Sequence, residues 1–439
     1  MNAVVLAVIV MLALSFARVH VVIALIVGAL SGGLLAGMGL TATMDSFTTG
    51  IANGASIALS YAMLGAFAVA IAHSGLPQAF AGWVVEKART GGKGLWLKWG
   101  LLTVVLLAGI ASQNVVPIHI AFIPLLIPPL LVAFNHFKVD RRLLACVMTF
   151  GLVTTYMYLP YGFGNVFLNE ILLANINQAG MDTAGINVMT AMGIPALGMV
   201  AGLLIAVFVT YRRPRTYADL PVAGEETTVP TQKVETYRIV VALIAIVLSL
   251  VIQIWADSLL LGALVGFGVF LASRIVRWGE AGDVFDRGMK MMAMIGFIMI
   301  AAQGFAQVMR DTGHVDSLVT ASAAMFGGSK LVGSLIMLLV GLLVTLGIGS
   351  SFSTLPIITA IYVPLCVALG FSPLATVSII GTAGALGDAG SPASDSTLGP
   401  TAGLNADGQH DHIRDTVIPT FIHYNIPLLL AGWAAAMVL

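Results

Sequence analysis

The chain alternates between apolar runs and short polar connections along its whole length. A transmembrane helix needs about 20 apolar residues, and most of these runs approach that length. They predict crossings near residues 3–17, 21–40, 56–72, 143–159, 190–210, 238–256, 258–273, 289–308, 374–387 and 416–438. The first run has no basic segment in front of it and a second run follows at once, so we expect a retained helix and not a cleaved signal peptide. The pattern predicts an all-α polytopic membrane protein.

Two apolar stretches are too long for a single crossing. Residues 97–134 cover 38 positions, and one helix of that length would reach about 57 Å against about 30 Å of hydrocarbon. The polar segment SQNVVP (Ser112 to Pro117) lies in its middle, and basic residues precede and follow the stretch. Because basic residues gather on the cytoplasmic side, both ends are expected there, which predicts a re-entrant hairpin. Residues 331–369 repeat the pattern around GSSFSTLP.

The two halves of the chain resemble each other. A shift of 238 pairs Phe67, Ala68 and Gly75 with Phe305, Ala306 and Gly313, and a shift of 239 pairs Ser112, Pro117, Ile118 and Ala121 with Ser351, Pro356, Ile357 and Ala360. The loops around the first hairpin hold seven basic residues, whereas the matching loops of the second hold one, Lys330. The second hairpin is therefore expected to enter from the outside. Chance similarity is the alternative; our interpretation is two inverted-topology repeats, each with a re-entrant hairpin and a broken transmembrane helix, as in many secondary transporters.

The expected domains follow the repeats. They are N-terminal scaffold helices in 1–55, a first repeat in 56–211 (hairpin 97–134, broken helix 143–174), a cytoplasmic linker in 212–237, scaffold helices in 238–288, a second repeat in 289–404 (hairpin 331–369, broken helix 374–404), and a loop and final helix in 405–439.

Composition narrows the class of protein. Hydrophobic residues make up 59% of the chain and charged residues 9%, against roughly 25% charged in soluble proteins. The 20 basic and 20 acidic residues cancel, which gives no basis for a nucleic-acid partner. Cys146 and Cys366 lie in apolar runs and are expected to be buried small side chains, not a metal site or disulfide. The expected surroundings are the lipid bilayer of a bacterial inner (plasma) membrane, with no cofactor beyond Na⁺ or H⁺ as transported ions.

Candidate binding residues lie where polar segments interrupt the apolar runs. The four breaks are SQN, SSFST, TTYMYLPYGFGN (154–165) and LGDAGSPASDSTLGP (386–400). Irregular backbone at membrane depth must be satisfied by protein or water, and its carbonyls and helix ends can bind ions. We expect substrate or cation contacts from Ser112, Gln113, Asn114, Tyr156, Ser350, Ser351, Ser353, Thr354, Asp388, Ser391, Ser394 and Asp395.

The two aspartates of the last break give the strongest signal. An ionised Asp at the centre of a membrane helix costs about 2.5–3.5 kcal/mol, and a carboxylate in a partly dry pocket can hold either a proton or a cation. We expect Asp388 to bind a metal cation, Na⁺ first, and Asp388, Asp395 and His119 to carry protons. The alternatives are that both aspartates cap the helix resuming near Ser396, and that His119 is a hydrogen-bonded packing residue.

Two inverted hairpins, each followed by a broken helix, resemble the ion transporter superfamily. Within it, GTAGALGD and GDAGSPASDSTLGP are similar to the sodium/proton antiporter family of NhaC type, and the resemblance extends over most of the chain from about residue 56. It implies an elevator mechanism, in which the hairpins and broken helices contain the site and move relative to a scaffold. It also implies that the scaffold forms a homodimer. It places Asp388 in the cation site, and at the hairpin tips it places Ser112, Gln113 and Asn114 with Ser351, Ser353 and Thr354. SQN departs from the Ser-Asn-Thr of carboxylate carriers, which disfavours citrate or succinate as substrate.

The sequence predicts a secondary active transporter, not an enzyme, that exchanges Na⁺ for H⁺. The close alternative is a Na⁺- or H⁺-coupled transporter of a small amino acid or hydroxy acid. An intramembrane aspartyl protease would need carboxylates on two facing helices, whereas Asp388 and Asp395 share one break. A channel is a further alternative, but a doubled, asymmetric break suits alternating access better than a pore.

Overall fold

The computed structural model of the chain describes residues 2–17, 19–76, 79, 83, 86, 95–115, 119–218, 220, 235–256, 258–325, 328–348, 350–392 and 394–439. Every regular element within these ranges is a helix, which confirms the all-α prediction. In the described part of the chain, four helices are long and apolar enough to cross a membrane, and one bent pair adds a fifth span: Val188–Thr210, Thr236–Ala256, Ser351–Ala368, His412–Val438, and Arg141–Tyr158 with Phe163–Gln178. The protein is a multi-pass membrane protein.

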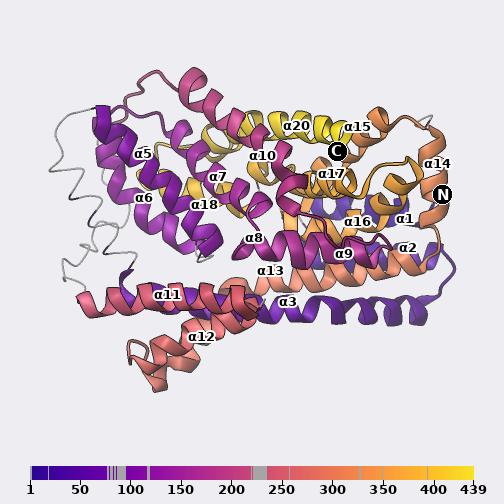
Figure 1. Cartoon of the computed structure of the whole chain (residues 1–439), viewed down its shortest axis with the longest axis horizontal. Helices are drawn as coiled ribbons and strands as arrows, with labels where there is room; N and C mark the ends of the chain where they lie inside the picture. The colour runs from indigo at the N-terminus through magenta and orange to yellow at the C-terminus, as the bar shows by residue number, and fades with distance from the viewer. Residues whose placement is uncertain are drawn as a thin grey trace.

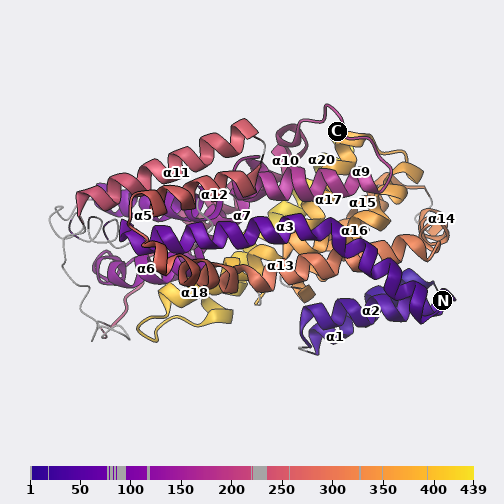
Figure 2. The same ribbon diagram turned by 90° about the horizontal axis from the view of Figure 1, so that it is seen from below.

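Two long helices, α3 (Leu40–Ser74) and α13 (Ala281–Asp311), lie side by side along one side of the molecule (Figures 1 and 2). A β-carbon added at Gly50 would meet Gln303, and one added at Gly65 would meet Gly288, so the two helices run antiparallel in close contact. The helices packed beside them are α2 (Val21–Leu35), α11 (Thr236–Ala256) and α12 (Leu259–Ala272), and α1 (Ala3–Phe16) packs on α2. We call this set the scaffold.

Helices α3 and α13 also carry the internal repeat. The paired residues Phe67 and Phe305 are both buried, and the paired glycines Gly75 and Gly313 both have positive φ at the helix end (83° and 66°). Equivalent helices that run antiparallel are what an inverted repeat produces. Both helices are longer than predicted, because hydropathy misses polar turns such as that of Ser46, whose hydroxyl is bonded to Asp311. The predicted domain limits at 55 and 288 fall within these helices, and the division itself stays a prediction.

The two hairpins lie toward opposite ends of the molecule (Figure 1). The first consists of α5 (Leu95–Ile110), the short π-helical η1 (Ala111–Val115) and α6 (His119–His136). The second consists of α15 (Lys330–Ile348) and α16 (Ser351–Ala368), preceded by α14 (Val315–Met325), which the sequence pattern did not predict. The tips fall at the polar segments predicted from the sequence.

Each hairpin is followed by a broken helix. Helix α7 (Arg141–Tyr158) ends, the axis bends by 55°, and the chain resumes as α8 (Phe163–Asn165), η2 (Val166–Leu173) and α9 (Ala174–Gln178). Helix α17 (Pro373–Ala385) likewise ends before the short turn η5 (Asp388–Gly390) and α18 (Asp395–Leu404). The core is completed by α10 (Val188–Ile205) with η3 (Ala206–Thr210), and by η6 (His412–Val417), α19 (Ile418–Thr420), η7 (Phe421–Asn425) and α20 (Ile426–Val438).

The repeats interleave within this core. Helix α18 of the second repeat packs on α6 of the first hairpin, where Gly403 leaves room for Ile123 and Ile127. Reciprocally, η2 and α9 of the first repeat pack on α16, with the rings of Phe167 and Phe352 5.2 Å apart. Each hairpin is therefore held by the broken helix of the other repeat.

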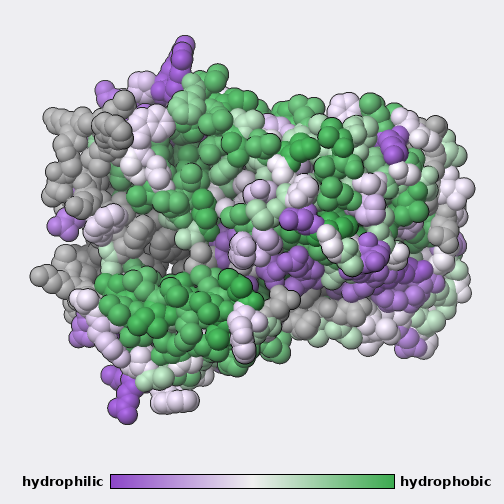
Figure 3. All heavy atoms as spheres, in the orientation of Figure 1, coloured by the Kyte–Doolittle hydropathy of each residue, from purple (hydrophilic) through white to green (hydrophobic). Residues whose placement is uncertain are grey.

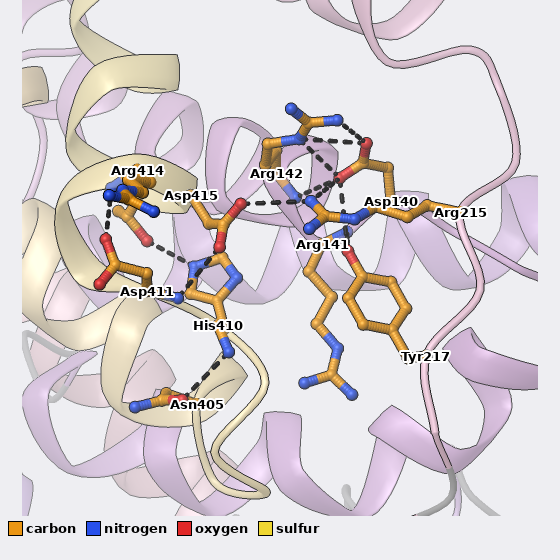
Figure 4. Close-up of polar contacts among 11 residues, drawn as sticks. Asp140, Arg141, Arg142, Arg215, Tyr217, Asn405, His410, Asp411, Arg414 and Asp415 are labelled. Atoms are coloured by element: carbon orange, nitrogen blue, oxygen red, sulfur yellow. Dashed lines mark hydrogen bonds and ion pairs between the residues drawn. The ribbon is translucent and has the colours of Figure 1, made fainter.

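A charged cluster fixes the start of α7 (Figure 4). Arg141 is fully buried and donates hydrogen bonds of 2.6 Å to both carboxylate oxygens of Asp407, in the loop after α18. Asp140 caps α7 and pairs with Arg142 at 2.6 Å. Because a buried guanidinium needs its partners, this cluster ties the first repeat to the end of the second broken helix.

Candidate cation and substrate site

The carboxylate of Asp388 lies buried in the second break and is surrounded by hydroxyl groups. Its Oδ1 accepts a hydrogen bond of 2.6 Å from Ser394, and its Oδ2 accepts from Ser396 at 3.0 Å and from Tyr156 at 2.7 Å. Asp388 is 6% exposed. Ser394, not Asp388, caps α18 through the Ser396 backbone N–H. The cap alternative therefore does not hold for Asp388.

Tyr156 joins the two repeats at this carboxylate. It lies in α7, just before the first break, and its hydroxyl is 2.9 Å from Ser351 Oγ at the tip of the second hairpin. Since the phenol has one proton and gives it to Asp388, Ser351 is left to donate to the phenol oxygen. Three of the four predicted breaks therefore meet in one hydrogen-bonded chain.

An aromatic cluster closes one side of the site. Phe352 follows Ser351 and lies 5.2 Å from Tyr156, 4.6 Å from Phe163 and 5.2 Å from Phe167, measured between ring centroids. Tyr61 of α3 continues the row at 5.5 Å from Phe163. These rings remove water from the carboxylate, and a dry surrounding strengthens its interaction with any cation.

The first hairpin tip presses against the first break. Gly162 has a φ of 59°, and a β-carbon there would overlap the carbonyl oxygen of Asn114. The Asn114 side chain donates to the Thr155 carbonyl at 3.3 Å, and Ser112 bonds to the Gly109 carbonyl at 3.0 Å. Among the described residues, Asn114 Oδ1 and Gln113 Oε1 are buried without a hydrogen-bond partner. The first hairpin tip therefore contacts the first break through Asn114.

The second hairpin tip sits against the second break in the same way. Gly387 has a φ of 94° and approaches Thr345 of α15, while its N–H donates to Asn425 at 2.6 Å. Ser391 donates to the Leu346 carbonyl at 3.5 Å. Helix ends that meet in this way leave carbonyls and N–H groups directed at a common region.

The remaining predicted residues lie around this centre. Ser350 and Ser353 are 3.3 Å apart, and Thr354 lies 3.1 Å from Thr345. Asp395 is half-buried at the start of α18. His119 begins α6, and its side chain lies outside the described residues. The structure thus brings Tyr156, Ser351, Asp388 and Ser394 together, and the binding role of every predicted residue stays a prediction.

Two polar residues near the site were not predicted as ligands. Ser396 contacts Asp388, and the spacing of hydroxyls within the break, Ser394-x-Ser396, could have indicated it. Glu170 lies in the apolar run VFLNEILL of η2, where one acidic residue in a membrane segment is itself a functional signal.

The arrangement suits reversible binding of a small cation. In the described part of the chain, no basic side chain forms an ion pair with Asp388. A buried carboxylate without a cationic partner carries a large desolvation cost, which either a proton or a bound cation relieves. Hydroxyl and carbonyl oxygens nearby are the ligands that hard cations prefer.

Comparison with known proteins gives two family matches. Residues 147–433 match the Na⁺/H⁺ antiporter family, and residues 2–88 match a second family described as Na⁺-H⁺ antiporter. A membrane protein of Vibrio parahaemolyticus is 54% identical over 443 residues, covering both chains fully. YuiF of Bacillus subtilis, which carries the name of an amino acid transporter, is 51% identical over 448 residues and is also covered fully.

Two solved structures share the fold. The YdaH transporter of Alcanivorax borkumensis aligns with a TM-score of 0.59 at 18% identity, over 91% of this chain and 89% of that one. MtrF of Neisseria gonorrhoeae, described as one of a class of antimetabolite efflux pumps, aligns with a TM-score of 0.56 at 16% identity, over 92% and 85%. At these identities the likeness concerns architecture, and it agrees with the inverted-repeat fold predicted from the sequence.

Proposed function

Because the chain belongs to the Na⁺/H⁺ antiporter family of secondary transporters, we propose that it exchanges Na⁺ for H⁺ at Asp388. The observation that carries this proposal is the buried carboxylate with three hydroxyl donors and no cationic side chain paired to it within the described residues. Proton and Na⁺ would neutralise the same charge, so binding of one excludes the other. That competition couples the two fluxes.

The exchange is tested in everted membrane vesicles that carry a pH gradient. Addition of Na⁺ should discharge the gradient in vesicles with the wild-type protein, and Asp388→Asn should abolish the response. Asp311→Asn is the matched control, because Asp311 is a scaffold carboxylate bonded to Ser46. Wild-type vesicles that do not respond to Na⁺, Li⁺ or K⁺ would exclude this function.

The second candidate is cation-coupled transport of a small amino acid. It is favoured by the full-length 51% identity to a protein named as an amino acid transporter. In this version the cation sits at Asp388 and the N-terminus of α18 holds the substrate carboxylate, since exposed N–H groups at a helix start favour anions. Uptake of radiolabelled amino acids and hydroxy acids into proteoliposomes, with and without a Na⁺ gradient, separates the two functions.

We propose that transport uses an elevator motion of the core against the scaffold. Within the described residues, two side-chain hydrogen bonds join the core to α11 and α13: Gln253 to the Gly162 carbonyl at 3.4 Å and Gln303 to Asn175 at 3.3 Å. Such sparse polar contacts allow sliding. A short bifunctional thiol reagent across Gln303→Cys and Asn175→Cys should stop transport, and full activity after complete cross-linking would contradict the motion.

We further propose a homodimer in the bacterial inner membrane. Helix α11 exposes Val247 (60%), Ile254 (64%) and Trp255 (80%), and Figure 3 shows an apolar surface over this part of the scaffold. Single-molecule photobleaching in lipid vesicles measures the subunit count directly. A single bleaching step at high labelling efficiency would exclude the dimer.

A further inference from the structure

The second half of the first broken helix carries a polar face that the Asp388 site does not use. Asn165, Asn169 and Glu170 are all half-buried on η2 and the turn before it. Asn169 donates to Asn165 at 2.5 Å, and Asn165 in turn donates to Glu170 at 3.4 Å. One acidic and two amide side chains thus form a continuous hydrogen-bonded row within an otherwise apolar helix.

The π-helical geometry of η2 explains how these residues share a face. A π-helix bonds each residue to the fifth one along, so positions five apart stack more closely than in an α-helix. Asn165 and Glu170 are separated by that interval, and Asn169 lies one turn from Asn165. An α-helix continuing without this widening would rotate Glu170 toward the neighbouring apolar positions. Such widened turns occur frequently at functional sites.

A second, independent group faces the same region from the scaffold. The hydroxyl of Tyr61 on α3 is fully buried and has no hydrogen-bond partner among the described residues. The Tyr61 ring lies 5.5 Å from that of Phe163, measured between centroids, and Phe163 lies two residues before Asn165. A buried hydroxyl without a partner costs about 1–3 kcal/mol, which a ligand or water at this position would relieve.

The polar face is open on one side of the molecule. Figure 3 shows hydrophilic side chains gathered in the region that α9 and the neighbouring end of α13 occupy in Figure 1. Asn177 and Gln178 are exposed at the end of α9 and continue this polar surface to the loop of residues 179–187. An acidic residue at membrane depth normally faces the protein interior or a water-filled cavity and marks a functional site.

An aromatic row connects the polar face to the carboxylate of Asp388. Tyr61 contacts Phe163, Phe163 contacts Phe352, and Phe352 contacts Tyr156, with ring centroids between 4.6 and 5.5 Å apart. Tyr156 then donates to Asp388. The polar face therefore lies at one end of the aromatic wall and the proposed cation site at the other.

We infer that Glu170, with Asn165, Asn169 and Tyr61, forms a cation-collecting vestibule that delivers a positively charged group to the Asp388 site. The inference rests on the proposed function, because the site to which the cation is delivered is Asp388. Its ligand is an alkali cation or the ammonium group of an amine substrate, because a carboxylate, amide oxygens and a phenol recognise both. The negative charge focuses such cations where the surrounding protein is apolar.

The charge selectivity of the vestibule can be measured without any transport assay. Asn169→Cys places a thiol on the polar face, and Cys146 and Cys366 are buried, so the parent protein provides the background. A membrane-impermeant cationic methanethiosulfonate should modify Cys at this position about tenfold faster than its anionic counterpart. Adding Glu170→Gln should bring the two rates together, whereas adding Asp182→Asn, at an exposed position in the loop between α9 and α10, should leave the ratio nearly unchanged.

A second cysteine position, introduced separately, keeps the test decisive. Asn165→Cys samples the same face and should show the same preference, so a folding defect in one variant does not end the experiment. Equal rates for both reagents in the presence of Glu170, or an unchanged ratio after Glu170→Gln, would overturn the inference. Absence of modification at both positions in folded protein would also overturn it, because a vestibule must be open to water.

Protection of the introduced cysteine from modification identifies the ligand. Choline keeps the ionic strength constant while Na⁺ or methylammonium is added. If Na⁺ slows the modification, the ligand is an alkali cation; if methylammonium slows it, the ligand is an amine group. If neither cation slows the modification, the inference is contradicted. Failure of the proposed Na⁺/H⁺ exchange would give a different result from failure of the vestibule inference. In that case wild-type vesicles give no Na⁺ response, while the modification rates still report on the vestibule.

Discussion

Tyr156 and Asp388 come from the broken helices of opposite repeats and share a hydrogen bond of 2.7 Å. The phenol also touches Ser351 of the second hairpin, so a single side chain connects three polar breaks. Any movement that opens the contact between the repeats must also change the hydrogen bonding of the carboxylate. Ion occupancy and the packing of the two repeats are thereby linked.

Tyr156→Phe should weaken cation binding without unfolding the protein. A hydrogen bond to a charged group contributes about 1.5–3 kcal/mol, which corresponds to roughly a 10- to 100-fold change in apparent affinity. The measurement is the Na⁺ concentration that gives a half-maximal response in everted vesicles. Tyr362→Phe is the matched control, because its buried hydroxyl bonds to the Met337 carbonyl within the second hairpin. Equal effects of both substitutions would assign Tyr156 a merely structural role.

Gly162→Ala should prevent correct assembly of the first hairpin against the first break. The new methyl group would overlap the Asn114 carbonyl, and positive φ adds about 1–2 kcal/mol of backbone strain. Gly185→Ala carries the backbone strain alone, since Gly185 has a φ of 79° and nothing within 4 Å. The yield of monodisperse protein and its melting temperature compare the two. A Gly162→Ala protein as stable as the Gly185→Ala protein would refute the close contact.

Asp407→Asn should destabilise the folded state by about 3–5 kcal/mol, because it leaves the buried Arg141 guanidinium without its counter-charge. The half-exposed pair of Arg215 and Asp415 offers the comparison, and Asp415→Asn should cost about 1 kcal/mol or less. Denaturation of both variants in the same detergent gives the difference. Replacing Arg141 and Asp407 together by Met and Leu should recover much of the loss, whereas a double variant as unstable as Asp407→Asn would contradict this explanation.

Stability should fall between pH 6.5 and pH 4 because of His410. Burial lowers the pKa of His410 to about 4, the charges of Arg141 and Arg215 act in the same direction, and Asp415 and Asp140 oppose them. The unfolded chain binds this proton near pH 6.5 and the folded chain does not, so stability is complete above pH 6.5 and decreases as the pH falls. At pH 5 the loss is about 2 kcal/mol.

Melting temperatures at pH 7.5 and pH 5 measure this effect. His410→Gln can keep a hydrogen bond to Thr416, which His410 contacts at 2.7 Å, but it has no titrating group. The variant should therefore lose less stability on acidification than the wild type. An identical pH dependence in both proteins would place the acid sensitivity elsewhere.

The sequence predicted the breaks because the membrane makes polar residues expensive. SQN, SSFST and the LGDAGSPASDSTLGP segment interrupt runs that are otherwise apolar, and all three coincide with helix ends or hairpin tips. The lengths of α3 and α13 were underestimated, because their outer turns are polar but are satisfied by contacts such as Ser46 with Asp311. Hydropathy records the solvent preference of a residue and not the partner that replaces the solvent.

Which of the polar residues meet could not be read from the sequence. Ser351 reaches Asp388 through Tyr156, while Ser353 and Thr354 bond within their own hairpin, although the three are near neighbours in the chain. Helical rotation decides this, and it depends on packing between repeats that lie far apart in sequence. Glu170 was not among the predicted residues, although it is a lone acidic residue in an apolar run, and its place beside Asn165 depends on the π-helical turn.

The interleaved packing of the repeats has a consequence for how this chain is made. A product that stops in the 212–237 connection would present Phe167 and the exposed face of α6 with no counterpart, because α16 and α18 have not yet been synthesised. The first half would therefore be incompletely packed in the bilayer until translation supplies the second. Membrane insertion and assembly of this transporter would in that sense be two separate events, and only the later one would bring Tyr156 to Asp388.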